Sequence, residues 1–95
     1  MDIIILYYKK WYGENMNTYE AVKNRILQLL GKHKMSIHKL ATESAVAPSS
    51  IKNILYGKSI NPGIVTLKML CDGFGITLTE FFDTPEFRNL EQEIK

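Results

Sequence analysis

Polar side chains recur between residues 48 and 53 and point away from an apolar stripe formed by Ile51 and Ile54. Asn53 is the most informative of them, because a side-chain amide can form two hydrogen bonds with the edge of an adenine. The alternative interpretation is that Asn53 is an exposed asparagine with no role in binding. If the segment is a helix, its outward side chains can contact base edges in a major groove of DNA. The expected base contacts are Pro48, Ser49, Lys52 and Asn53.

Basic residues concentrate in the middle of the 95-residue chain, although its net charge is only +2. Residues 19–75 contain eight Lys or Arg and three Asp or Glu, which leaves +5. Residues 76–95 contain two basic and five acidic residues, which leaves −3. A basic centre favours a polyanionic partner such as nucleic acid. Ordinary solvent-exposed helix faces carry similar charge, so charge alone leaves both interpretations open.

Capping residues and apolar periodicity predict helices from residue 17 onward. Asn17 with Glu20, and Thr77 with Glu80, have the spacing of capping boxes, in which each side chain satisfies a free backbone N–H at a helix start. Gly31 is expected to end the first helix, and apolar residues recur at helical spacing within each segment. The expected helices are 17–31, 36–43, 48–56, 64–74, 77–82 and 84–95.

The helices expected at 36–43 and 48–56 are short and separated by a tight turn, which is the arrangement of a helix-turn-helix. The first helix must support the second at a steep angle, so that the exposed face of the second enters a major groove about 12 Å wide. Many helical bundles also contain short helix pairs, so the spacing alone does not decide the function.

The residues of this pair resemble a known family. Residues 36–58 resemble the helix-turn-helix of the Xre family of phage-repressor-like regulators, with the sequence SIHKLATESAVAPSSIKNILYGK. The continuation through Asn61-Pro62, Thr66-Leu67 and residues 75–82 is similar to the closing helices of that family. The resemblance covers roughly residues 19–82. It implies an all-α fold, a compact five-helix DNA-binding domain that regulates transcription, usually as a dimer on a two-fold operator.

The resemblance also implies contacts with the phosphate backbone around the second motif helix. Lys39 precedes that helix, Lys52 lies on it and Lys58 follows it, so all three border the groove. Lysines on exposed helix faces are also common without such a role. Tyr56 either packs on the end of the helix or donates to a phosphate. The expected phosphate contacts are Ser36, Lys39, Ser50, Tyr56, Lys58 and Asn61.

Three residues depart from the pattern of the family. Ile37 stands where the family often has a glutamine that helps to hold phosphate. Ala45 replaces the usual left-handed glycine of the turn, and Ala47 replaces the Ser or Thr that caps the second helix. If the turn keeps the family geometry, Ala45 has a positive φ, a conformation that disfavours residues other than glycine by roughly 1 kcal/mol.

Other chemistry has little support in the sequence. Cys71 is the single cysteine and lies on an apolar stripe, so we expect a small buried residue rather than a nucleophile. His33 and His38 have no cysteine or carboxylate at metal-ligand spacing, and the carboxylates gather in the last twenty residues rather than around a cleft. We therefore expect that the protein is not an enzyme and that it binds no cofactor and no metal ion. No small-molecule ligand is evident either.

The two ends of the chain lie outside the family resemblance. The expected division is an N-terminal arm (1–16), the DNA-binding domain (17–83) and an amphipathic C-terminal helix (84–95). Three interpretations of the arm stay open: a strand that pairs with its copy in a dimer, an apolar arm over its own domain, or an extension from an upstream start codon. The longest apolar run, residues 3–8, is too short to cross a membrane, so a cytoplasmic protein is expected.

The sequence therefore predicts a sequence-specific regulator, a repressor by the resemblance, that binds double-stranded operator DNA as a homodimer. Phe87, Leu90 and Ile94, together with residues 3–11, are expected to supply the apolar surface for the dimer. The alternative is an antitoxin or anti-repressor that uses the same fold to bind a protein partner. The salt dependence of binding to duplex DNA distinguishes the regulator from the protein-binding alternative. Each phosphate that the protein neutralises contributes about −0.9 to the slope of the logarithm of the DNA-binding constant against the logarithm of the salt concentration.

Overall fold

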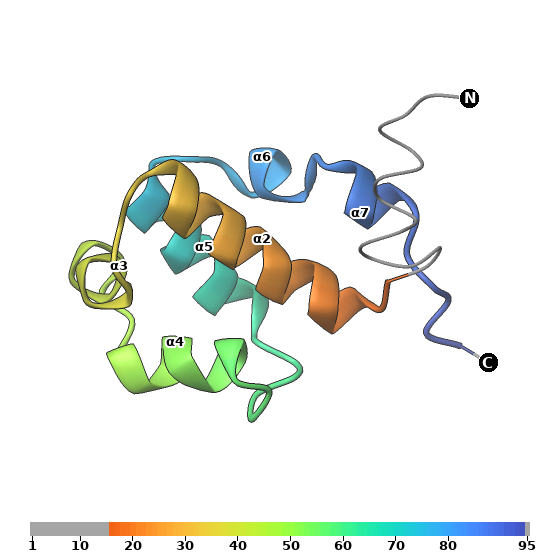
Figure 1. Ribbon diagram of the computed structural model, residues 1–95, viewed down its shortest axis with the longest axis horizontal. Helices are drawn as coiled ribbons and strands as arrows, with labels where there is room; N and C mark the ends of the chain where they lie inside the picture. Colours follow the sequence, from red (N-terminus) through yellow and green to blue (C-terminus); the bar gives the residue numbers. More distant parts are fainter. Residues whose placement is uncertain (1–15, 95) are drawn as a thin grey trace.

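The computed structural model describes residues 16–94, and the regular elements in that range are all helices (Figure 1). The expected all-α fold is confirmed. The helices are α2 (Thr18–Lys32), α3 (Ile37–Ser44), α4 (Pro48–Leu55), α5 (Ile64–Phe74), α6 (Leu78–Phe82) and α7 (Pro85–Arg88). Of the expected N-terminal arm, only Met16 lies within the described residues. The expected domain boundaries stay predictions.

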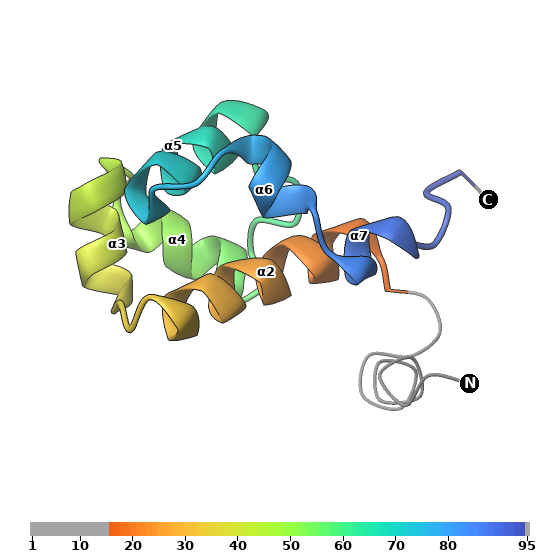
Figure 2. The ribbon, with the colours of Figure 1, turned by 90° about the horizontal axis from the view of Figure 1, so that it is seen from above.

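The helices enclose one core of buried apolar side chains. α3 packs against both α4 and α5, while α2 packs against α4 and α7. Figure 2 shows α3 at one end of the molecule and α7 toward the other. Full burial of a Leu, Ile or Phe side chain stabilises a fold by about 1.5–3 kcal/mol relative to leaving it exposed. The most deeply buried are Ile26, Leu29, Leu40, Ile51, Leu70, Cys71 and Phe81.

The close approach of α3 to α5 depends on Gly73. A Cβ atom at this position would lie 2.9 Å from Ser44 Cβ, 3.1 Å from the Ser44 backbone nitrogen and 3.2 Å from Leu40 Cδ1. Contacts this short are repulsive, and a backbone atom cannot move aside alone. Glycine at position 73 therefore fixes how near α5 lies to the first helix of the expected helix-turn-helix.

The start of α2 agrees with the sequence, and its end does not. The Asn17 side chain accepts a hydrogen bond from the Glu20 N–H at 2.8 Å, as its capping position predicts. The expected stop at Gly31 is wrong, because α2 continues to Lys32 and the left-handed residue is Lys34, with φ 51°. The N–H groups of Lys34 and Met35 donate back to the carbonyls of Gly31 and Leu30, which closes the helix.

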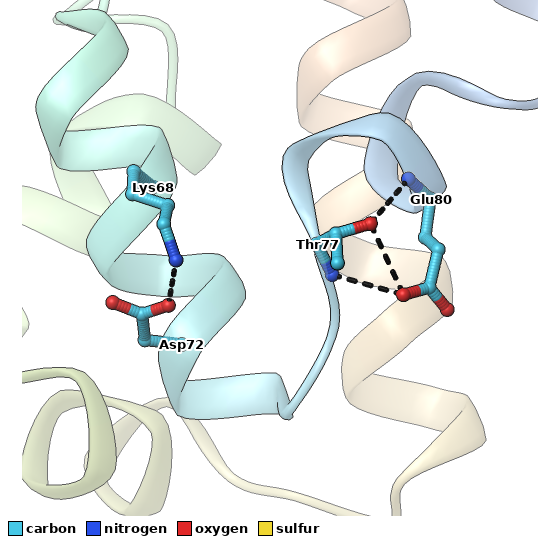
Figure 3. Close-up of polar contacts among 4 residues, drawn as sticks. All are labelled: Lys68, Asp72, Thr77 and Glu80. Atoms are coloured by element: carbon cyan, nitrogen blue, oxygen red, sulfur yellow. Dashed lines mark hydrogen bonds and ion pairs between the residues drawn. The ribbon is translucent and has the colours of Figure 1, made fainter.

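The start of α6 is fixed by the predicted capping box. The Thr77 hydroxyl oxygen accepts from the Glu80 N–H at 3.0 Å, and the Glu80 carboxylate accepts from the Thr77 N–H at 3.1 Å. Figure 3 shows this pair beside the ion pair of Lys68 with Asp72 on α5. The reciprocal bonds satisfy two backbone donors of a helix that has only five residues.

The expected helix over 84–95 is wrong in its length. α7 ends at Arg88, and Leu90 instead forms an isolated parallel bridge with Met16. The Glu91 N–H donates to the Met16 carbonyl at 3.1 Å, so the backbone after α7 finds a partner from the start of the described chain. This pairing replaces the next helical turn.

The apolar residues at the C-terminal end do not form the exposed stripe that the sequence suggested. Phe87 is half-buried, and its ring centroid lies 4.9 Å from Phe82 and 6.0 Å from Phe81. Leu90 is also half-buried, and only Ile94 is exposed. The shortened helix turns Phe87 and Leu90 partly onto the domain, residues 3–11 lie outside the described residues, and the expected dimer surface stays a prediction.

Candidate nucleic-acid interface

α3 and α4 form the helix pair that the sequence predicts, joined by the tight turn Ala45 to Ala47. The Ser36 hydroxyl oxygen caps α3 by accepting from the Lys39 N–H at 3.0 Å. Ala45 follows α3 in the left-handed conformation, with φ 58° and ψ 26°, which confirms the expected turn geometry. This conformation changes the direction of the chain, so that α4 begins after only three residues and runs in a different direction from α3.

The turn is held by its buried members rather than by Ala45. Val46 is buried in the core, and its N–H donates to the Ser44 hydroxyl at 3.3 Å. Ala45 itself is exposed, so its methyl group gains little packing in exchange for the strained backbone. Ala47 at the N-cap of α4 offers no side-chain acceptor, and Pro48 in the first turn has no N–H that would need one.

α4 presents a polar face to solvent. Ile51 and Ile54 are buried, which fixes the rotation of the helix about its axis. The expected base-contacting residues Pro48, Ser49, Lys52 and Asn53 all lie at exposed positions. Within residues 16–94 the side chains of Ser49, Lys52 and Asn53 have no hydrogen-bond or ion-pair partner. Their donors and acceptors therefore remain available to a ligand of polar, ordered groups such as base edges.

The C-terminal end of α4 is fixed by Tyr19, whose polar role was not predicted from the sequence. The Tyr19 hydroxyl, on α2, donates to the Ile54 carbonyl at 2.5 Å. Gly57 follows in the left-handed conformation with φ 82°, and the Lys58 N–H donates back to the Asn53 carbonyl at 2.9 Å. The sequence offered one signal, a tyrosine within an otherwise aliphatic stripe, since a buried tyrosine hydroxyl usually finds a partner.

The residues expected at phosphates come from α3, α4 and the loop after α4, and all of them are exposed. They are Ser36, Lys39, Ser50, Tyr56, Lys58 and Asn61. Tyr56 is 71% exposed, so its side chain does not pack on the end of the helix. Lys39 differs from Lys52 and Lys58, because its ammonium lies 2.8 Å from the Glu43 carboxylate one turn further along α3. An exposed pair of this kind contributes less than about 1 kcal/mol and gives way readily to a phosphate.

Part of the basic charge counted in the sequence has a structural role instead. Arg25 on α2 donates from Nε to the Phe81 carbonyl at 2.7 Å and from Nη2 to the Glu80 carbonyl at 2.8 Å. These bonds satisfy carbonyls in the last turn of α6 and attach that helix to α2. Local sequence patterns do not indicate this role, because Arg25 and Phe81 are 56 residues apart. Charge near α4 comes mainly from Lys52 and Lys58.

The described residues show no other reactive centre. Cys71 is fully buried, as expected, and burial raises the pKa of its thiol, which keeps it protonated. His33 stacks on the ring of Phe74 with centroids 5.6 Å apart. In residues 16–94 no group of three His, Cys, Asp or Glu side chains is arranged to hold a metal ion. No helix in the same range is both long and apolar enough to cross a membrane.

Comparison with known proteins agrees with this geometry. The family model of the Cro/C1-type helix-turn-helix DNA-binding domain matches residues 25–86, which is more than half of the chain. The crystal structure of the prophage Lp1 protein 11 is similar, with a TM-score of 0.68 and 28% sequence identity over 79% of this chain and 100% of that one. No curated protein matches the chain. The family match confirms the resemblance found in the sequence.

Proposed function

The chain belongs to the family of Cro/C1-type helix-turn-helix DNA-binding domains, and from this premise we propose that it is a repressor that binds operator DNA through α4. As a member of that family it is a DNA-binding transcriptional regulator. The observation that carries the assignment of the contact surface is the exposed polar face of α4, opposite the buried Ile51 and Ile54. The likeness to a prophage protein supports the family assignment.

In this proposal the residues of α4 divide into base-contacting and backbone-contacting groups. Asn53 pairs with an adenine through its amide, Ser49 contacts a base near the helix start, and Lys52 reaches guanine or phosphate. Pro48 lies at the entry of the helix into the groove. Lys58 contacts phosphate just beyond α4, and with it the exposed residues Ser36, Lys39, Ser50, Tyr56 and Asn61.

We further propose a homodimer on a two-fold operator, in which exposed apolar residues after α4 contribute to the interface. Ile60, Ile64 and Val65 are 65%, 59% and 70% exposed and lie on the loop after α4 and the first turn of α5. Grouped exposed apolar residues commonly mark interfaces. This patch begins just after Lys58, at the end of α4. Pairing through it therefore places the two α4 helices of a dimer on either side of the two-fold axis. That arrangement suits two operator half-sites about 34 Å apart.

The same role needs no catalytic group and no cofactor, and it places the protein in the cytoplasm with the DNA that it regulates. Family membership supports each of these proposals, since the family acts by binding DNA. The antitoxin or anti-repressor alternative is not favoured, because the match is to a DNA-binding domain rather than to a protein-binding module.

Selection of duplexes from a random library, followed by titration at several salt concentrations, tests the proposal. We expect one preferred sequence and a slope of log K against log salt of several units, at about −0.9 per phosphate contacted. Asn53→Ala is expected to weaken the preferred duplex by roughly 1–3 kcal/mol while leaving non-specific binding nearly intact. Lys58→Ala is its matched control, and should weaken all duplexes and make the slope shallower by about one unit.

Two outcomes would contradict the proposal. Absence of duplex binding at low salt would favour the protein-interaction alternative. Equal weakening of every duplex by Asn53→Ala would show that this residue positions the protein on the backbone, so that the base-contacting face would have to be assigned to other side chains.

A further inference from the structure

A cleft lies between the start of α2, the loop from α4 to α5 and the segment after α7. Its volume is about 810 Å³, within the range of roughly 300–1,000 Å³ that is typical of small-molecule sites. The described residues that line it come from parts of the chain far apart in sequence: Asn17, Thr18, Tyr19, Val22, Ile60, Asn61, Pro62, Leu67, Phe82, Glu91, Gln92 and Glu93.

The cleft combines an apolar floor with an acidic rim. Val22 and Leu67 belong to the buried core, and the half-buried Phe82 packs against the same core. The charged side chains among the described lining are both acidic, Glu91 and Glu93, and both are exposed. They belong to the C-terminal segment 76–95, whose net charge is −3. An apolar surface beside negative charge matches a ligand that is apolar at one end and cationic at the other.

We propose that this cleft binds a small organic cation with an aromatic or aliphatic body. The body lies against Val22, Leu67 and Phe82, where it leaves water. Its ammonium group lies toward Glu93, where an exposed carboxylate attracts a cation modestly and in a salt-dependent way. Among residues 16–94 no basic side chain lines the cleft, so the described lining offers an anion no charged partner.

Two lining residues connect the cleft to the DNA-contacting surface. Tyr19 lies in the cleft wall, and its hydroxyl holds the Ile54 carbonyl at the end of α4. Asn61 lines the cleft and is also one of the phosphate contacts in the proposed function. A ligand in the cleft lies in the space beside Asn61 and competes with phosphate for access to that side chain, so we expect occupation of the cleft to weaken DNA binding. This second step rests on the proposed function, whereas binding to the cleft does not.

A matched pair of probes tests the site in the absence of DNA. The full chain, labelled at its methyl groups, is titrated by NMR with 1-naphthylmethylamine and with 1-naphthylacetate, which differ in the sign of their charge. We expect the amine to shift the methyl resonances of Val22 and Leu67 with a low-millimolar dissociation constant, as its small size implies. The acid should bind about tenfold more weakly, because attraction at the rim becomes repulsion. Equal affinities, or unchanged Val22 and Leu67 resonances, would overturn the proposal.

Two charge-matched variants separate the rim from general attraction to an acidic protein. Glu93→Gln should weaken amine binding about threefold, the size expected for one exposed charge. Asp72→Asn removes one negative charge from α5, outside the described lining of the cleft, and should leave the affinity unchanged. Equal losses in the two variants would overturn the assignment of the ammonium to the rim.

The coupling to DNA has its own readout. Saturating amine, but not the acid, should weaken binding to a selected duplex several-fold, and an unchanged affinity would refute the link through Asn61. Failure of the protein to bind any duplex would contradict the proposed function instead, whereas the methyl shifts assess the cleft without DNA.

Discussion

Replacing Gly73 by alanine should destabilise the protein, although alanine is the better helix former. In a helix interior without tertiary contacts, Gly→Ala stabilises by about 1 kcal/mol. At Gly73 the new methyl group would lie 2.9 Å from Ser44 Cβ and 3.1 Å from the Ser44 nitrogen. Overpacking of this kind typically costs about 1–3 kcal/mol. The two effects leave a net loss of about 1 kcal/mol.

Gly31 provides the matched control on α2. It also lies in the last turn of its helix, and an added Cβ would meet no atom within 4 Å. Gly31→Ala should therefore stabilise by about 0.5–1 kcal/mol. The two identical substitutions should differ by about 2 kcal/mol, which corresponds to roughly 10 °C between their melting temperatures for a domain of this size.

Thermal and urea denaturation followed by circular dichroism at 222 nm measures both variants against the parent chain. The urea m-value should stay constant, which shows that only stability has changed. Stabilisation of Gly73→Ala to the same extent as Gly31→Ala would refute the reasoning, because it would mean that α3 and α5 can separate without loss. If Gly73→Ala is destabilised as expected, α3 is positioned by a backbone contact rather than by an adaptable side chain.

Three further substitutions test other parts of the structure. Ala45→Gly should stabilise by roughly 1 kcal/mol in urea denaturation, because it relieves a positive φ at an exposed residue, and a loss of stability would contradict the strain. Tyr19→Phe should cost about 1 kcal/mol by the same measurement through loss of the bond to the Ile54 carbonyl, and a neutral result would mean that this bond has no net value. Val65→Glu should convert the proposed dimer to a monomer in light scattering at micromolar concentration, whereas a parent chain that is already monomeric would refute the dimer.

The sequence predicted best those features that depend on neighbouring residues. The caps at Asn17 and Thr77 follow from side chains that reach backbone N–H groups three residues away. The outward face of α4 follows from the helical period. Once Ile51 and Ile54 are buried, the rotation of the helix about its own axis is fixed, and so are the side chains that face solvent. The positive φ of Ala45 follows from the turn geometry that the family resemblance implies. No distant contact is needed for any of these.

Features that depend on distant contacts were missed or wrong. The terminal helix was expected to continue because Phe87, Leu90 and Ile94 have helical spacing, but the pairing of Leu90 with Met16 ends it. Local periodicity cannot register a backbone partner that lies more than seventy residues earlier in the chain. The predicted end of α2 was wrong for a local reason instead, because Lys34 rather than Gly31 adopts the left-handed conformation that propensity assigns to glycine.

Net charge was a poor guide to the proposed DNA-contacting surface, because charge must be counted after structural partners are assigned. Arg25 binds the carbonyls of α6, Lys68 pairs with Asp72, and Lys39 pairs with Glu43. Lys52 and Lys58, at the exposed side and the end of α4, have no such partner among residues 16–94. Lysines without a partner attract a phosphate backbone more effectively than cations already engaged by a carboxylate or a carbonyl, since exposed charges act within a screening length of about 8–10 Å. The position of the charge, rather than its sum, therefore supports α4 as the contact helix.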